Sequence, residues 1–256
     1  MRLVEARIFQ GISWIRHGVL APSWRDGKPD PADNLSFKSG AESQVRQARA
    51  LAGELLGVNP AHFTYMYQVH SAMVFRVTRA DRGKGAFPNI PQVGNGDAMV
   101  TDTTNVPISI LVADCIPIFL VDPHNRAIGL AHAGWRGTVE RIVAETIRKM
   151  HECFNTDPGD ILVWIGPGID RCCFEVGPEV MAQFQDSFPG WELYWLDRSG
   201  NINLKEINLR IALAEGVRPE NIEISGDCTF CGEGYFSYRR DGARTGHNLC
   251  ALAIVE

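Results

Sequence analysis

The segment from residue 97 to residue 133 most constrains the fold, because it contains four apolar runs that are almost uninterrupted. They are "DAMVTD" (97–102), "PISILVAD" (107–114), "IPIFLVD" (116–122) and "AIGLAHA" (127–133). A strand with one face in solvent alternates apolar and polar residues, whereas a strand buried on both faces is apolar along its whole length. We therefore expect these runs to form strands of a sheet that is covered on both sides.

Helices are predicted to supply the covering layers. Residues 42–56 and 138–154 carry apolar side chains at helical spacing, and Gly57 marks the end of the first helix. Two further helices are expected at 178–188 and 203–216, and further strands at 61–78, 161–167 and 249–256. Helices between strands, together with hairpin-like strand pairs, predict an α/β fold: a layered sandwich with a mixed, largely buried β-sheet flanked by helices. The order contains no clean run of βαβ units, so a regular Rossmann fold is not expected.

Length and charge limit the classes of function. A chain of 256 residues with 45% apolar residues suits one large domain, and we expect residues 1–256 to form a single domain. The net charge of −5 argues against a nucleic-acid partner, and no apolar run is long enough to span a membrane. The first residues lack the features of a signal peptide, so a cytoplasmic location is expected. The oligomeric state does not follow from the sequence.

The seven cysteines are an odd number and lack the regular spacing of a disulfide framework. In a reducing cytosol most of them are expected to be buried thiols. "CTFC" (228–231) has the spacing of half a zinc site or of a redox pair, but a single CxxC is a weak signal. Cys172 and Cys173 are adjacent, so their side chains are expected to point apart and to serve packing.

His70, Cys115 and His132 each lie at or near the end of an expected strand. Side chains from distant segments can meet at such a sheet edge. Two imidazoles and a thiolate are good ligands for a divalent ion such as Zn²⁺, and three protein ligands leave one coordination position free, as in catalytic zinc sites. The alternative is that both histidines and the cysteine are packed core residues.

Two arginine-containing segments are candidates for anion binding. In "HAGWRGT" (132–138), Gly134 and Gly137 flank Arg136 just before an expected helix, so backbone N–H groups and the guanidinium can hold a phosphate. The alternative is a tight turn with a solvated arginine. Arg240, in "YFSYRRDGARTGHNL" (235–249), is either a substrate contact or part of a solvated turn.

Seven segments together resemble one family. They are "NLSFKSG", "QVHSAMV", "GDAMVTD", "VADCIPIFLVDP", "AHAGWRGTV", "IGPGIDRCCFEVG" and "FSYRRDG", and they follow one another along nearly the whole chain. They resemble the laccase-domain or polyphenol oxidase family (YfiH-like), which is similar to zinc-dependent purine nucleoside phosphorylases and shares its fold with toxin-type cysteine deamidases. The resemblance implies that His70, Cys115 and His132 bind the metal and that Arg49, 21 residues before His70, belongs to the active site.

The resemblance also implies the reactions. They are phosphorolysis of adenosine, inosine and methylthioadenosine, a transferase activity, and deamination of adenosine, a hydrolase activity. Purine nucleosides and phosphate are then the partners, and zinc is the expected cofactor, with copper as a less favoured ion. The chain departs from the family pattern at Ser71, where the family has glycine, and at His247, where it has arginine.

Three other functions stay open. A metal-free cysteine hydrolase or deamidase would use Cys115 as nucleophile with His70 or His132 as base. A polyphenol oxidase with copper is the older label, but a multicopper centre needs many histidines, and this chain has seven and no HxH pair. A non-catalytic protein that senses nucleosides or metal is the third.

Overall fold

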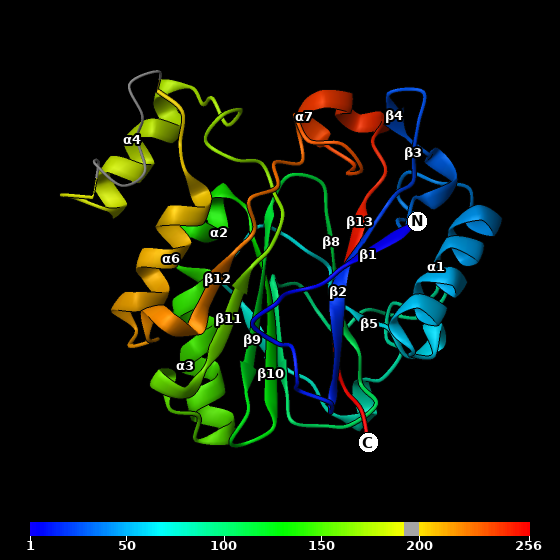
Figure 1. The fold of residues 1–256 in the computed structure, drawn as a ribbon, viewed down its shortest axis with the longest axis horizontal. Coiled ribbons are helices and arrows are strands. Elements are labelled where there is room, and N and C mark those ends of the chain that lie inside the picture. The colour runs from blue at the N-terminus through cyan, green and yellow to red at the C-terminus, as the bar shows by residue number, and fades with distance from the viewer. Residues whose placement is uncertain (192–199) are drawn as a thin grey trace.

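The computed structural model describes residues 1–191 and 200–256, and its elements form four layers in the order helix, sheet, sheet, helix (Figure 1). The first sheet has the strand order β1 (Arg2–Val4), β2 (Ile15–Ala21), β13 (Asn248–Ile254), β8 (Ile108–Val112) and β5 (Thr64–Tyr65). The second has the order β12 (Ile222–Ile224), β11 (Leu162–Ile165), β9 (Ile116–Asp122), β10 (Ala127–Ala133), β7 (Ala98–Thr101) and β6 (Val74–Arg76). β3 (Trp24–Arg25) and β4 (Lys28–Pro29) pair with each other in a separate two-stranded sheet.

The two sheets pack face to face, and this explains why β9 is apolar from Ile116 to Val121. All seven of its residues are buried. Phe119 and Val121 belong to the core between the sheets, whereas Ile118 and Leu120 belong to the core under the helices. Successive side chains of a strand point to opposite faces, so a central strand of this sandwich needs apolar residues at every position.

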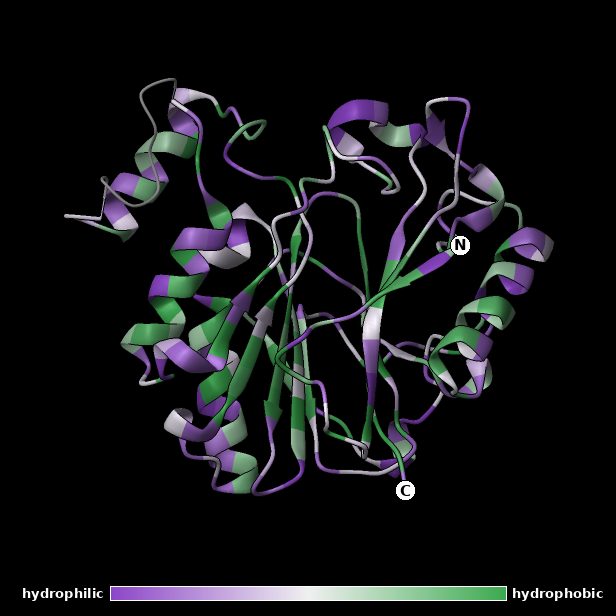
Figure 2. Cartoon of the chain, in the orientation of Figure 1, coloured by the Kyte–Doolittle hydropathy of each residue, from purple (hydrophilic) through white to green (hydrophobic). Residues whose placement is uncertain are grey.

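Helices cover the outer faces of both sheets. α3 (Ile142–Phe154) and α6 (Leu204–Ala214) pack on the second sheet, and α1 (Glu42–Leu56) packs on the first. The other α-helices of the described residues are α2 (Trp135–Val139), α4 (Pro178–Ser187) and α7 (Tyr238–Asp241). Figure 2 shows apolar residues concentrated on the strands and hydrophilic residues on the outer helical surfaces and loops. Within the described ranges, no helix combines the length and the apolar character needed to cross a membrane.

The expected layered α/β fold with mixed strand pairing is confirmed, and so are several element boundaries. The strands at 116–122 and 127–133 and the helix at 42–56 have the predicted limits. The expected single sheet is in fact two sheets stacked on each other.

Two local predictions were wrong, and one strand was missed. The helix expected at 138–154 is divided into α2 and α3, because Arg141 adopts a left-handed backbone conformation with φ 61°. The strand expected over 61–78 is limited to β5 and β6, and the irregular segment between them carries His70. β2 was not predicted at all.

The double-sided burial of β9 makes a stability prediction. Leu120→Ala should lower the free energy of unfolding by about 2–5 kcal/mol, because it leaves a cavity under the helical layer. Leu51→Ala is the matched control, since Leu51 is 39% exposed on α1. Chemical denaturation of both variants measures the difference, and equal unfolding free energies would contradict the placement of Leu120.

Candidate active site

A cavity of about 890 Å³ lies at the end of the sandwich where loops from both sheets meet. His70, Cys115, His132, Arg49, Tyr65 and His247 are among the residues that line it. Ligand pockets for small molecules commonly have volumes of about 300–1,000 Å³. The cavity is therefore large enough for a small organic ligand together with an anion.

Strand pairing brings Cys115 and His132 together. β9 and β10 are antiparallel, and His132 is paired with Pro117 while Ala133 is paired with Ile116. Cys115 directly precedes Ile116, so the start of β9 lies beside the end of β10. A thiol and an imidazole that are 17 residues apart in the sequence thus become neighbours at one sheet edge.

His70 approaches from a different direction, on the irregular segment between β5 and β6. Its backbone has φ 61°, a left-handed conformation that is uncommon outside glycine. Its ring centroid lies 4.9 Å from that of His132. His70 is exposed, Cys115 is half-buried and His132 is buried, so the group has one face toward solvent.

The three side chains fit a single divalent ion. One nitrogen from each histidine and the Cys115 sulfur all lie within 4.8 Å of one another. This approaches the separation of about 3–4 Å that ligand atoms have around a tetrahedral zinc ion. A Cβ atom at Gly134 would lie 2.8 Å from the Cys115 sulfur and 2.9 Å from Nδ1 of His70, so only glycine leaves this space free.

Asp97 connects the segments that carry the two histidines. Its Oδ1 lies 2.8 Å from Nδ1 of His132, which leaves Nε2 of that ring for a metal ion. Its Oδ2 accepts hydrogen bonds from the Ser71 N–H at 2.7 Å, the Ser71 hydroxyl at 2.9 Å and the Val69 N–H at 3.2 Å. A carboxylate behind a histidine ligand fixes its ring orientation and raises its basicity.

The electrostatics of the site favour a negative sulfur. Burial raises the pKa of the Cys115 thiol, but the charge and hydrogen bonds of His132 and His70 outweigh this and lower it to about 6. Burial likewise lowers the pKa of His132, but the Cys115 thiolate and Asp97 raise it to about 9. The Cys115 thiolate and the Asp97 carboxylate therefore stabilise a positive charge at the His132 ring. This charge is either the imidazolium itself or a metal ion bound to the ring.

Arg49 reaches the same cavity from α1. It is buried, its Nε donates to the Leu35 carbonyl at 3.0 Å, and its Nη1 donates to the Ala86 carbonyl at 2.8 Å. Its guanidinium lies over the rings of Phe37 and Tyr65, at 4.4 and 4.3 Å from their centroids. These contacts hold one positive charge in a fixed place at the cavity wall.

The other predicted anion-binding residues lie elsewhere. Arg136 is on the exposed side of α2, stacked on Trp135, and is not among the residues lining the cavity. Gly137 packs close to the Ser71 carbonyl, where a Cβ would be 3.2 Å away. Gly134 is part of the triad's surroundings and not of a separate phosphate cradle.

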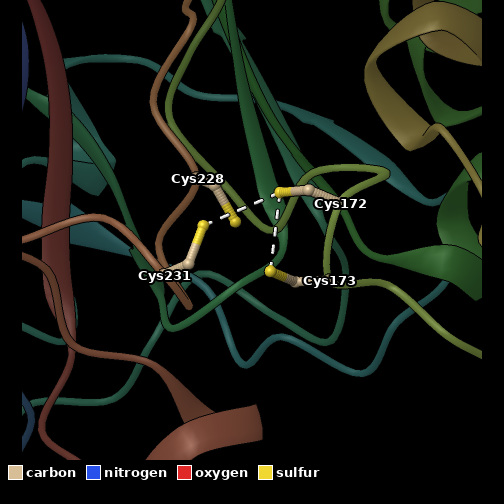
Figure 3. A group of neighbouring side chains, drawn as sticks. All are labelled: Cys172, Cys173, Cys228 and Cys231. Carbon is tan, nitrogen blue, oxygen red and sulfur yellow. Dashed lines mark hydrogen bonds between the residues drawn. The ribbon is translucent and has the colours of Figure 1, made fainter.

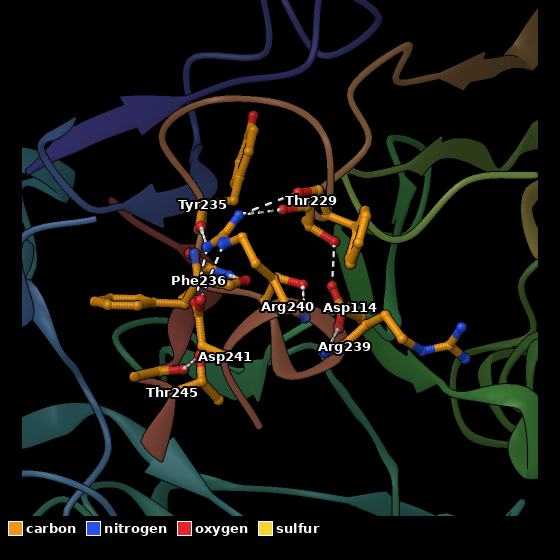
Figure 4. A network of polar contacts seen from close by, with 12 residues as sticks. Asp114, Thr229, Tyr235, Phe236, Arg239, Arg240, Asp241 and Thr245 are labelled. Atoms are coloured by element: carbon orange, nitrogen blue, oxygen red, sulfur yellow. Dashed lines mark hydrogen bonds and ion pairs between the residues drawn. The ribbon is translucent and has the colours of Figure 1, made fainter. Parts of the chain in front are cut away.

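Arg240 braces the loop that follows β12 and does not line the cavity. Its guanidinium donates to the carbonyls of Thr229 and Tyr235 at 3.2 and 2.8 Å and forms an ion pair with Asp241 at 2.9 Å (Figure 4). Arg239, from the same segment of the sequence, lines the cavity instead.

Asp114 holds two loops to the end of β8. Its carboxylate accepts hydrogen bonds from the Thr229 hydroxyl and from the Arg239 N–H, both at 2.6 Å (Figure 4). Its backbone carbonyl accepts from the Ile169 N–H at 2.8 Å. Asp114 thus connects the end of β8 to the segments that carry Ile169, Thr229 and Arg239.

Sequence reasoning missed two polar groups at the site. Asp97 stands in the quoted segment "GDAMVTD", but nothing local shows that its carboxylate meets His132. Tyr65 is 2% exposed, lines the cavity, and its hydroxyl has no hydrogen-bond partner among the described residues. A buried hydroxyl without a partner costs free energy, so this group is available to a ligand.

Comparison with known proteins gives one matching family and several relatives. The model of the family described as "Multi-copper polyphenol oxidoreductase laccase" matches residues 26–255. "Purine nucleoside phosphorylase YlmD" of Geobacillus stearothermophilus is 38% identical over 194 residues, which cover 74% of this chain and 71% of that protein. The protein of the same name in Bacillus subtilis is 31% identical over 225 residues, covering 84% of this chain and 79% of that one.

Solved structures agree with the fold. The crystal structure of YlmD from Geobacillus stearothermophilus matches with a TM-score of 0.88 and 32% identity, covering 98% of this chain and 94% of that chain. The hypothetical protein YfiH of Bacillus licheniformis matches with a TM-score of 0.86 and 27% identity, covering 94% of each chain.

The hydrogen bond between Asp97 and His132 predicts a measurable effect on metal affinity. Asp97→Asn removes the charge behind the ring and should weaken zinc binding by about 10–100-fold. Asp102→Asn is the control, because Asp102 is exposed and its side-chain contacts in the described structure, an ion pair with Arg76 and a hydrogen bond from the Thr103 hydroxyl, lie away from the triad. Competition with a metal-binding dye measures both affinities, and an unchanged affinity for Asp97→Asn would refute the role given to this carboxylate.

Proposed function

The chain belongs to the family described as multi-copper polyphenol oxidoreductase laccase, and from this premise we propose that it is a zinc-dependent purine nucleoside phosphorylase. Its proposed substrates are adenosine, inosine and methylthioadenosine, with phosphate as the second substrate and with an additional adenosine deaminase activity. The names of its relatives support an enzyme of this class. The observation that carries the proposal is the convergence of His70, Cys115, His132 and Arg49 on one cavity.

The lining of the cavity offers contacts for a purine base and for an anion. The rings of Phe37, Tyr65, Phe87 and Phe174 offer apolar faces on which a purine can stack. Lys38, Arg49 and Arg239 are cations that line the same cavity, and guanidinium groups bind phosphate oxygens in pairs. This arrangement favours Arg49 over Arg136 for the phosphate.

His70, Cys115 and His132 would hold the metal ion. A divalent ion with three protein ligands supplies a Lewis acid and lowers the pKa of water at its free position. Asp97 keeps His132 oriented through Nδ1, and the half-buried sulfur and the buried imidazole limit access of bulk water to one side.

The two proposed reactions differ in the nucleophile, which is phosphate in phosphorolysis and water in deamination. In phosphorolysis, a phosphate oxygen forms a bond to the ribose C1′ as the bond to the purine nitrogen breaks, and the products are ribose 1-phosphate and the free base. Arg49 would hold the phosphate, and its fixed position spares the entropic cost of ordering the charge. In deamination, water replaces the amino group at C6 of adenosine, and inosine and ammonia leave.

His247 changes the charge of the pocket at a position where the family pattern has arginine. It lines the cavity, and burial, with smaller effects from Lys38 and His132, lowers its pKa to about 4. The imidazole is therefore neutral near pH 7 and can exchange hydrogen bonds with a ligand but adds no positive charge. We expect the affinity for phosphate to rest on the remaining cations.

A second candidate uses the same residues without metal. The low pKa of Cys115 and the raised pKa of His132 describe a thiolate beside an imidazolium, the pair found in cysteine hydrolases and deamidases. Copper is the alternative ion for the triad, as the family's description suggests. A multicopper oxidase is not proposed, because a multicopper centre needs many histidines. Among the described residues, the groups that could hold a metal contain two histidines, His70 and His132.

One assay tests the proposal directly. Purified protein is incubated with adenosine and phosphate, the products are separated by chromatography, and zinc is measured on the same sample. Cys115→Ala and His132→Ala should each lose bound metal from the triad and slow purine release by on the order of 10³-fold, the equivalent of several kcal/mol of charge stabilisation.

Cys153→Ser is the control, because Cys153 lies on α3, outside the cavity lining. Full activity in either triad variant would remove the triad from the reaction. An enzyme that survives metal removal by a chelator but is inactivated by iodoacetamide would instead support the cysteine hydrolase.

A further inference from the structure

Four cysteines outside the cavity meet at the carboxyl ends of two neighbouring strands. Cys172 and Cys173 follow β11, and Cys228 and Cys231 follow β12. β11 and β12 are parallel partners, with Ile165 opposite Ile224, so the loops that leave them run side by side. The two loops are joined by a bridge between Gly168 and Cys228.

The four sulfur atoms have the spacing of ligands around one ion. All lie within 4.8 Å of one another (Figure 3). The sulfur of Cys172 is 3.7 Å from that of Cys231 and 3.5 Å from that of Cys173. Zinc–sulfur bonds of about 2.3 Å in a tetrahedron place the sulfurs about 3.8 Å apart. The adjacent pair Cys172 and Cys173 therefore does not point apart, contrary to the expectation from the sequence.

The "CTFC" turn is built around the sulfur of Cys228. The Asp170 N–H, from the neighbouring loop, donates a hydrogen bond to this sulfur at 3.4 Å. The Gly232 N–H donates to the Cys228 carbonyl at 2.8 Å, and a Cβ on Gly232 would lie only 2.4 Å from that oxygen. The hydrogen bond from Asp170 thus favours a thiolate, and the turn requires glycine directly after the second cysteine.

The four sulfur atoms lie too close together for several of them to be thiolates without a cation between them. Crowding of this kind disfavours a second negative charge in the cluster. A divalent cation removes this penalty, because it binds all four sulfurs as thiolates and their protons pass to solvent.

We propose that Cys172, Cys173, Cys228 and Cys231 form a second metal site, separate from the triad, that binds one zinc ion as a tetrathiolate. Four protein ligands complete the tetrahedron and leave no position for a substrate, so the site is structural and not catalytic. The proposal does not depend on the function proposed for the cavity.

The site would fix one wall of the cavity. Ile169 and Phe174, which line the cavity, lie on the loop that carries Cys172 and Cys173. Thr229, between the other two cysteines, donates to Asp114, directly before the triad's Cys115. The guanidinium of Arg239, another cavity residue, donates to the Glu175 carbonyl at 3.0 Å. An ion that joins the two loops would therefore hold three lining residues in place.

Metal analysis of matched variants tests the proposal. The full chain is purified without chelator, and the number of zinc ions per chain is measured by inductively coupled plasma mass spectrometry. Cys172→Ser and Cys231→Ser change exposed residues whose loss threatens folding little, and each should lower the zinc content by one ion per chain relative to wild type. His132→Ala should lose the other ion and keep this one, which separates the two sites.

Cobalt substitution identifies the ligands. His132→Ala loaded with Co²⁺ should show the visible absorption of tetrahedral thiolate ligation, and the same protein with Cys231→Ser added should lose it. Hydrogen exchange in residues 166–177 and 226–232 should be faster in Cys231→Ser than in the control Cys153→Ser, because the two loops are no longer joined.

Two results would overturn the proposal. One is a zinc content of Cys172→Ser and Cys231→Ser equal to that of wild type. The other is a disulfide between Cys172 and Cys231 in protein isolated with its thiols blocked, because a disulfide removes two of the four ligands.

Discussion

The carboxylate of Asp97 is the contact on which the candidate active site depends. One oxygen meets His132 on β10, and the other accepts three hydrogen bonds from Val69 and Ser71, on either side of His70. The His132 N–H in turn donates to the Asp97 carbonyl at 2.7 Å. One buried residue thereby fixes two imidazoles relative to each other, and the register of β9 and β10 adds the thiol of Cys115.

The architecture explains why chemistry gathers at this end of the sandwich. The interior strands are mostly apolar on both faces, so most polar side chains lie where strands end and loops begin. Asp114 links the triad side of this edge to the loops of the cysteine cluster, through Thr229 and the Ile169 N–H. The catalytic and structural sites proposed here are thus neighbours on one scaffold, one with an open coordination position and one closed.

Sequence patterns predicted the strands and residues that can be recognised from short stretches of the chain. The strands at 116–122 and 127–133 follow from unbroken apolar runs, and the triad follows from family motifs in the sequence. β2 was missed because its buried His17 reads as a surface residue, although it is satisfied by the Ala6 N–H at 3.0 Å. The role of Asp97 and the meeting of the four cysteines depend on pairing between distant strands, and β12, with three residues, is too short for any sequence pattern to reveal.

The most direct test of the triad is anomalous X-ray diffraction at the zinc absorption edge, on crystals of protein purified without chelator. The account predicts an anomalous peak about 2.0–2.3 Å from the sulfur of Cys115 and from one nitrogen of each of His70 and His132. Zinc found only at other positions, or an ion held by fewer than these three side chains, would contradict it.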